Sequence, residues 1–350
     1  MTQALTEFRC FGGANTADGF KSFFGELTGR VSYLYVIKGG PGTGKSFFMN
    51  LVKEEAQKRG LQTELIYCAS DPSSLDGILL PSLGIGVFDG TAPHTLDPGL
   101  PAVDGEWIRF DSFLDEKALA PKREKLEALA ARKKALYDHV TGEALIYAAA
   151  DREITDAVSE ALDTVKAERA AERLLKRCLS GKEGGCRTVQ VSSIGMRGSV
   201  RFPTLDMSAE EIRPIFGRGA DVFLSLLFRL AEAAGTETVV SYHPIVPGKP
   251  TELFFPDKGV LFTLRERKNG ENGINMDRFL IRSVLRQNRS AIRALNRIRA
   301  EALAEITARY GAIADCHFEI ERIYGSALDV RAKEEYSEEL IAKIFSSPKR

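Results

Sequence analysis

The segment 39–46 carries the clearest chemistry in the chain. It matches the pattern G-x-x-x-x-G-K-[ST] in full, as Gly39, Gly40, Pro41, Gly42, Thr43, Gly44, Lys45 and Ser46. The glycines let the backbone turn its N–H groups toward phosphate oxygens, and a following helix adds partial positive charge. In this motif the lysine reaches the β- and γ-phosphates and the hydroxyl binds Mg²⁺. We therefore predict that residues 39–47, ending at Phe47, bind ATP, with Lys45 as a catalytic cation and Ser46 as a magnesium ligand.

Two aspartates further along the chain could complete this site. Asp89 ends the apolar run 84–89, and in P-loop enzymes an aspartate at the end of a neighbouring strand completes the Mg²⁺ site. We predict that role for Asp89, although an Asp-Gly turn would use the same residue. Asp71 is a second catalytic candidate, as a base or in positioning water, and the alternative is a local Asp-Pro turn. Asp76 and His94 are nearby, and the sequence leaves their roles open.

The local sequence predicts the elements that would hold this loop. Residues 31–38 (VSYLYVIK) are β-branched and aromatic and predict a buried strand before it. Residues 47–59 predict a helix after it, and Gly60 stands where a helix C-cap is expected. A second strand is predicted over 62–68, followed by a polar loop over 69–77. This order is typical of an α/β fold built on a P-loop.

The second half of the chain contains an altered copy of the first. A shift of 175 residues places 42–88 on 217–263 without a gap and with eleven identical positions. A repeat of this length indicates two domains of one fold. We expect a P-loop domain over 1–180 and a degenerate copy over 181–350, joined at a flexible linker. We also expect each to end in a long helical hairpin, because apolar residues recur there at helical spacing.

The copy lacks the residues that we expect to bind phosphate and Mg²⁺ in the first half. Lys45 meets Ala220 and Ser46 meets Asp221, and the three candidate carboxylates Asp71, Asp76 and Asp89 meet Val246, Thr251 and Leu264. A carboxylate at position 221 would repel phosphate. We therefore predict that the second half binds no nucleotide.

Three runs together carry a family resemblance. With GGPGTGKS, CASDPSSLDG (68–77) and GVFDGTAPH (86–94), the chain resembles a poorly characterised bacterial family of tandem P-loop ATPases over nearly its whole length. The resemblance implies ATP binding and hydrolysis and names no substrate. Members often have a good P-loop in each half, whereas this chain has GRGAD at 217–221.

Composition limits the other function classes. The 350 residues include 48 Lys+Arg and 48 Asp+Glu, so the charge balance favours neither nucleic acid nor an anionic membrane. We expect a cytoplasmic protein, because the N-terminal sequence is not typical of a signal peptide and no apolar stretch is long enough for a span. Six arginines recur at helical spacing and predict a solvated helix face partly paired with the acidic run 334–339, or else a contact for a phosphate backbone or an acidic partner. They are Arg278, Arg282, Arg286, Arg289, Arg293 and Arg297.

These observations favour a Mg²⁺-dependent ATP-binding protein, an ATPase with one working nucleotide site in its first half. One alternative is a small-molecule or nucleotide kinase with Asp71 as the base. Another is a nucleotide-gated scaffold without turnover. The sequence indicates neither an acceptor, nor a protein partner, nor an oligomeric state.

Overall fold

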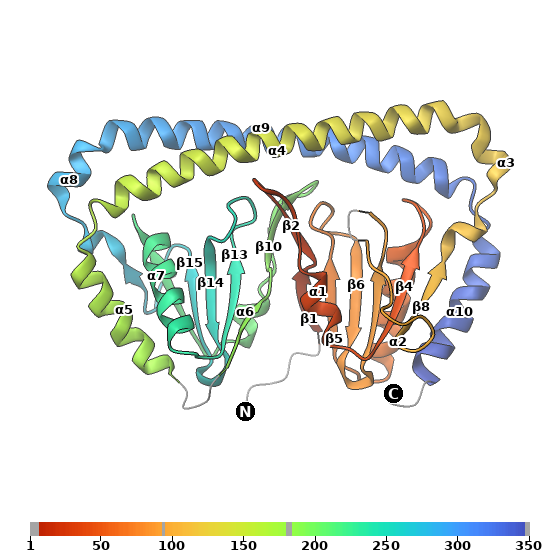
Figure 1. The fold of residues 1–350 in the computed structure, drawn as a ribbon, viewed down its shortest axis with the longest axis horizontal. Coiled ribbons are helices and arrows are strands. Elements are labelled where there is room, and N and C mark those ends of the chain that lie inside the picture. The colour runs from red at the N-terminus through yellow and green to blue at the C-terminus, as the bar shows by residue number, and fades with distance from the viewer. Residues whose placement is uncertain (1–6, 93–94, 180–183, 347–350) are drawn as a thin grey trace.

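A computed structural model describes residues 7–92, 95–179 and 184–346. The molecule is a mixed α/β protein with two six-stranded sheets side by side and two long helices running over both of them (Figure 1). His94 and the predicted boundary at 180/181 lie outside the described residues.

The first sheet has one antiparallel strand inside an otherwise parallel arrangement. Its order is β1 (Glu7–Phe11), β5 (Thr63–Tyr67), β6 (Leu75–Leu80), β7 (Ile85–Asp89), β4 (Tyr33–Lys38) and β8 (Gly105–Arg109), and β6 runs against both of its neighbours. The predicted strands at 31–38 and 62–68 are confirmed as β4 and β5, and the predicted helix is α2 (Lys45–Lys58). The expected polar loop over 69–77 is wrong in its second part, because β6 begins at Leu75 and is buried along its length.

The second sheet repeats this topology strand for strand. Its order is β9 (Cys186–Thr188), β13 (Thr238–Tyr242), β14 (Pro250–Phe255), β15 (Val260–Leu264), β12 (Glu211–Phe216) and β16 (Ile274–Asn275), and β14 is the antiparallel strand. A shift of 175 residues superimposes the bounds of α2 on those of α7 (Ala220–Ala233), and likewise β5, β6 and β7 on β13, β14 and β15.

Smaller elements also occur in matching pairs. The antiparallel hairpin β2 (Gly13–Thr16) and β3 (Gly19–Ser22) precedes α1 (Phe24–Thr28), as β10 (Ser192–Gly195) and β11 (Gly198–Arg201) precede α6 (Thr204–Ser208). Short helices α3 (Glu116–Leu119) and α8 (Arg282–Gln287) precede the long ones. Single 3₁₀ turns lie at Pro81–Leu83, Phe110–Phe113, Ala120–Lys122, Pro256–Lys258 and Met276–Phe279.

The two long helices pair with each other across the halves. Helix α4 (Arg123–Ser159) runs antiparallel to α9 (Arg289–Gly325), and each has 37 residues. Tyr137 and Tyr310 meet edge to face between them, within an apolar cluster that includes Val140 and Ile306. The predicted hairpin within each half is therefore wrong. Helical spacing shows which side of a helix is apolar, but it does not identify the helix that covers that side.

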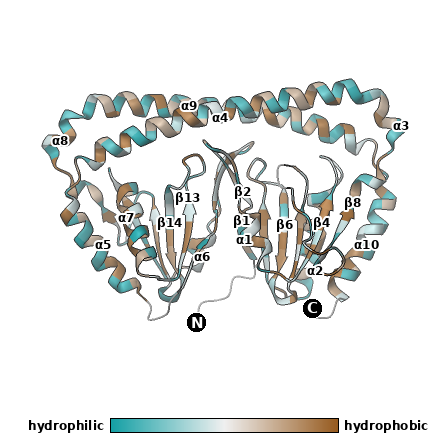
Figure 2. Ribbon diagram, viewed as in Figure 1, coloured by the Kyte–Doolittle hydropathy of each residue, from teal (hydrophilic) through white to brown (hydrophobic). Residues whose placement is uncertain are grey.

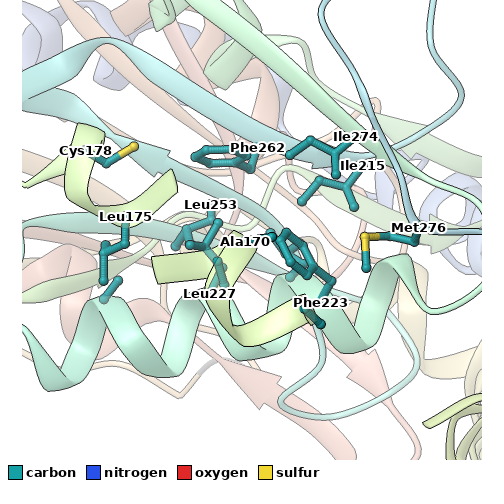
Figure 3. Close-up of a cluster of buried hydrophobic side chains, with 14 of the residues drawn as sticks. Ala170, Leu175, Cys178, Ile215, Phe223, Leu227, Leu253, Phe262, Ile274 and Met276 are labelled. Atoms are coloured by element: carbon teal, nitrogen blue, oxygen red, sulfur yellow. The ribbon is translucent and has the colours of Figure 1, made fainter. Parts of the chain in front are cut away.

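The helices that follow are exchanged between the sheets. Helix α5 (Thr164–Cys178) places Leu175 and Cys178 in the core of the second sheet, against Leu227 of α7 (Figure 3). Helix α10 (Val330–Ser346) places Leu340 and Ile344 in the core of the first sheet. Backbone hydrogen bonds fix both crossings, at Asp163 N to Phe279 O (2.8 Å) and at Asp115 N to Ala327 O (2.8 Å). Each sheet is thus covered by a helix from the other half of the chain.

The halves also share an apolar core. One cluster joins first-half residues such as Ile66 and Phe88 to second-half residues such as Val191 and Leu261. The strands are largely apolar and the long helices alternate in character, in keeping with a buried sheet and half-exposed helices (Figure 2). No helix of the described chain is both long and apolar enough to cross a membrane.

The arginine series does not follow one continuous helix. It begins in the 3₁₀ turn at Met276–Phe279, continues through α8, and resumes in α9 after a break at Asn288. Arg297 pairs with Glu301 on its own helix. The acidic run lies on α10, which packs on the first sheet, and no ion pair within the described residues joins it to the arginines. The expected pairing is wrong because α10 is exchanged to the far end of the molecule.

Candidate functional site: the glycine-rich loop and its cover

The backbone of the glycine-rich loop requires its glycines. Gly42 and Gly44 have φ of 78° and 84°, in the left-handed region that side chains rarely adopt, and Gly44 caps the start of α2. A Cβ added at Gly42 would lie 2.3 Å from the carbonyl oxygen of Glu321 in α9. The loop therefore curls tightly between its own helix and a helix of the second half.

The loop presents N–H groups without acceptors. Those of Gly42, Gly44, Lys45 and Ser46 donate to no group in the part of the chain that the structure describes, and that of Thr43 reaches Gly40 O only at 3.4 Å. The N-terminus of a helix leaves such donors unsatisfied and carries partial positive charge. The cradle is suited to an anion with several oxygens, as a phosphate group is.

Lys45 is folded back onto this loop. Its Nζ donates to Gly39 O at 2.7 Å and to Gly40 O at 3.0 Å, and it lies 3.5 Å from Asp89 Oδ2. Asp89 Oδ1 accepts from the N–H and hydroxyl of Thr91 at 2.8 and 2.5 Å. Burial raises the pKa of Asp89, and nearby Asp76 adds to the rise, while Lys45 and Thr91 oppose it. The structure thus brings the predicted lysine and aspartate together.

Ser46 connects the loop to β6. Its Oγ accepts the N–H of Leu75 at 2.8 Å, beside the buried Asp76. Gly77 of β6 lies opposite Phe88 of β7, so Asp76 and Asp89 lie at the same level on neighbouring strands. The hydroxyl and two carboxylates are hard oxygen donors of the type that Mg²⁺ prefers. Within the described residues no three His, Cys, Asp or Glu side chains form a metal site alone, so such an ion would also need oxygens of a ligand.

Sequence reasoning could not decide the role of Asp76. It belongs to the site because β6 runs antiparallel and therefore starts where its parallel neighbours end. That direction was not visible in the sequence.

Asp71 lies in a separate polar turn. Its Oδ1 accepts from the N–H and hydroxyl of Ser73 at 3.1 and 2.6 Å, and the guanidinium of Arg197 lies 3.8 Å away. Arg197 comes from the β10–β11 turn, whose Met196 N–H donates to Ser70 O at 2.7 Å. Within the described residues, no hydrogen bond or ion pair joins Asp71 to Lys45, Ser46 or Asp89. Its partners are those of a turn residue and of a contact between the halves.

The second half also supplies the cover of the loop. Tyr324 of α9 lies over Gly40, where an added Cβ would touch its ring at 3.8 Å, and the ammonium of Lys333 on α10 lies against Gly44. Beside them, Lys133 Nζ lies 3.1 Å from Nδ1 of His317. These residues are far from the loop in sequence, and no sequence signal connected them to it.

The corresponding loop of the second half has the same left-handed glycines, and its charged side chains pair with each other. Gly217 and Gly219 have φ of 84° and 81°, and Ala220 N–H donates back to Gly217 O at 3.3 Å. Asp221 Oδ2 accepts from Lys249 Nζ at 2.7 Å and from Thr155 Oγ1 at 3.0 Å. Burial opposes ionisation, but Lys249 and Thr155 hold the pKa of Asp221 below its usual value. An internal carboxylate thus stands at the position of Ser46.

A second carboxylate extends this charged cluster. Lys249 Nζ also lies 2.5 Å from Oδ2 of Asp151 in α4, and Arg299 of α9 donates to Asp151 Oδ1 at 2.7 Å. Asp151 is 3% exposed. The cluster therefore ties both long helices to the second sheet.

Comparison with known proteins adds no assignment. No protein-family model, curated protein or solved structure matches this chain significantly.

Proposed function

We propose that the glycine-rich loop is a P-loop that binds ATP with Mg²⁺, and that the protein is an ATPase with one nucleotide site per chain. The observation that carries this proposal is the cradle of N–H groups that have no acceptor among the described residues, with Lys45, Ser46 and Asp89 at its rim. The repeated strand order supports a second, degenerate P-loop domain.

Each residue then has a defined task. Lys45 exchanges the carbonyls of Gly39 and Gly40 for phosphate oxygens and neutralises their charge. Ser46 and Asp89 hold Mg²⁺, which when bound supplies positive charge beside the β- and γ-phosphates. Asp76, at the level of Asp89, raises the negative charge that attracts the cation.

The site geometry favours hydrolysis over transfer to a second substrate. A kinase mechanism would use Asp71 as the base, but its Oδ1 is engaged by Ser73 and lies near Arg197. A nucleotide-gated scaffold would share the binding residues and differ only in lacking turnover.

Calorimetric titration and an assay of labelled ATP test the proposal together. We expect one MgATP per chain and release of free phosphate, and Lys45→Ala should weaken binding by at least about 100-fold, because a charge-assisted contact to phosphate is lost. Lys58→Ala, on the exposed end of α2, is the matched control and should bind like the wild type. Normal affinity in Lys45→Ala, or no binding by the wild type, would overturn the site assignment. Two nucleotides per chain would overturn the single-site proposal.

A further inference from the structure

Lys333 is a cation placed against the glycine-rich loop by the other half of the chain. It lies on α10 and is 4% exposed. A Cβ added at Gly44 would lie 2.8 Å from its Nζ, so the ammonium touches the residue that caps α2. The ammonium of Lys45 lies at the other end of the loop, against Gly39 and Gly40.

This place is electrostatically unfavourable for an ammonium when the loop is empty. The N-terminus of α2 carries partial positive charge, and the ammonium of Lys45, which lies 3.5 Å from Asp89 Oδ2, is at the other end of the same loop. Of the residues the structure describes, no carboxylate lies within ion-pair distance of Lys333. The rings of Phe47 and Phe110, with centroids 4.8 and 5.9 Å from Nζ, give it only cation–π contacts. Burial lowers the pKa of Lys333, and Glu334 only partly opposes this.

The second half shows what happens where the loop has lost its chemistry. Superimposing the first residues of α5 and α10, Thr164 and Val330, places Lys333 on Ala167. Ala167 is buried in the apolar core of the second sheet. The degenerate loop therefore has alanine at both lysine positions, Ala220 for Lys45 and Ala167 for Lys333. If Lys333 served only to pack α10 on its sheet, the matching position of α5 would be expected to carry a lysine as well. That position is Ala167.

We propose that Lys333 is a second phosphate-binding cation, which contacts the phosphate chain of ATP at the Gly44 end of the loop while Lys45 serves the opposite end. This inference rests on the proposed function and extends it, because it makes the nucleotide site a joint product of both halves. In this proposal a bound phosphate compensates the charge of the Lys333 ammonium, which has no carboxylate partner among the described residues. Nucleotide also ties α10 to the loop.

Titration of MgATP into the full-length Lys333→Met variant tests this. We expect affinity to fall at least about tenfold. Without nucleotide the melting temperature should stay the same or rise, because a buried uncompensated charge has been replaced by an apolar chain of similar length. Arg331→Met, on the exposed side of α10, is the matched control and should change neither quantity.

Wild-type MgATP affinity in Lys333→Met would overturn the inference, and a lower melting temperature with unchanged affinity would assign Lys333 to packing alone. Should the methionine variant not fold, Lys333→Gln gives the same decision: raised Kd supports the proposal and wild-type Kd overturns it. If the wild type binds and Lys45→Ala does not, normal binding by Lys333→Met removes only this inference. If the wild type fails to bind, the proposed function falls with it.

Discussion

The two glycine-rich loops share a backbone conformation and differ in the charged side chains placed around it. Both turn through left-handed glycines into a helix of 14 residues. The first gathers Lys45, Lys333 and a helix N-terminus, whereas the second sets Asp221 against Lys249 at 2.7 Å. The second loop contains its own anion and is complete without a ligand. In the first loop Lys45 lies 3.5 Å from Asp89, whereas Lys333 has no carboxylate within ion-pair distance among the described residues. In our proposal the phosphates of ATP supply that anion.

This difference separates the residues that maintain the fold from those to which we assign a role in nucleotide binding. Glycines at the turn and apolar residues in the sheet are retained in both halves, because the strand-to-helix connection and the core depend on them. Lysines and carboxylates at the loops differ, because the strand-to-helix turn itself does not depend on them. A buried charge that has lost its ligand must be removed or given a protein partner. In the second half Ala220 stands at the lysine position, and the carboxylate of Asp221 is paired with Lys249.

The largest effect that would test this comparison is at Asp151. Asp151→Asn removes the charge shared by Lys249 and Arg299, and we expect the free energy of unfolding to fall by about 3 kcal/mol. His317→Gln removes the contact with Lys133 and the partly exposed pairing with Glu321 at 3.4 Å, and should cost less than about 1 kcal/mol, because an exposed pair contributes little. Urea unfolding of both variants measures the difference. Equal losses would mean that the second loop is not held by its ion cluster.

An intermediate effect is expected from pH acting on His243. Its Nδ1 accepts the N–H groups of Ile245 and Val246 at 3.1 and 3.0 Å, and burial lowers its pKa from 6.5 to about 4. Between these values the unfolded chain binds a proton that the native state refuses, so stability is present above pH 6.5 and is lost as pH falls toward 4. We expect the free energy of unfolding to fall by roughly 2 kcal/mol over this range. This is less than the whole pKa shift would give, because the ring of His243 is partly accessible to water.

His243→Asn keeps an acceptor for these N–H groups and cannot titrate in this range. The melting temperature of this variant should therefore fall less than that of the wild type between pH 7 and pH 4. Parallel curves for the two proteins would show that His243 does not carry the pH dependence of the second half.

The smallest effect concerns the metal side of the first loop. Asp89→Asn keeps the contact with Thr91 and removes one charge, so MgATP affinity should fall about tenfold while metal-free ATP affinity changes less. Asp97→Asn, on an exposed loop, is the matched control. Equal losses with and without magnesium would assign Asp89 to the turn with Thr91 alone.

Local patterns predicted the parts of the site that are close in sequence. Strand β4, the loop and α2 follow from β-branched residues, glycines and helical spacing, and the repeat located the matching elements of the second half. Asp89 was found because a carboxylate at a strand end has a recognisable place beside the loop.

The remaining parts depend on contacts that no local pattern specifies. Asp76 required the direction of β6, and Lys333 required the exchange of α10 to the first sheet. The apolar side of α10 does not indicate which sheet it covers, since the two sheets have the same strand order. Long-range pairing of similar elements is therefore the point at which sequence reasoning stopped.

The exchange of α5 and α10 also sets an order on biosynthesis. As the chain leaves the ribosome, the first sheet emerges with Tyr35 and Val87 among its apolar residues, but Leu340 and Ile344 follow only after the whole second sheet has been made. Domains made early usually fold first, whereas the core of the first sheet is completed only when α10 has been made. A nascent chain that stops before α10 exposes apolar residues of the first sheet, and such a surface is recognised by chaperones and proteases. The crossed helices thus couple completion of the first sheet to completion of the second.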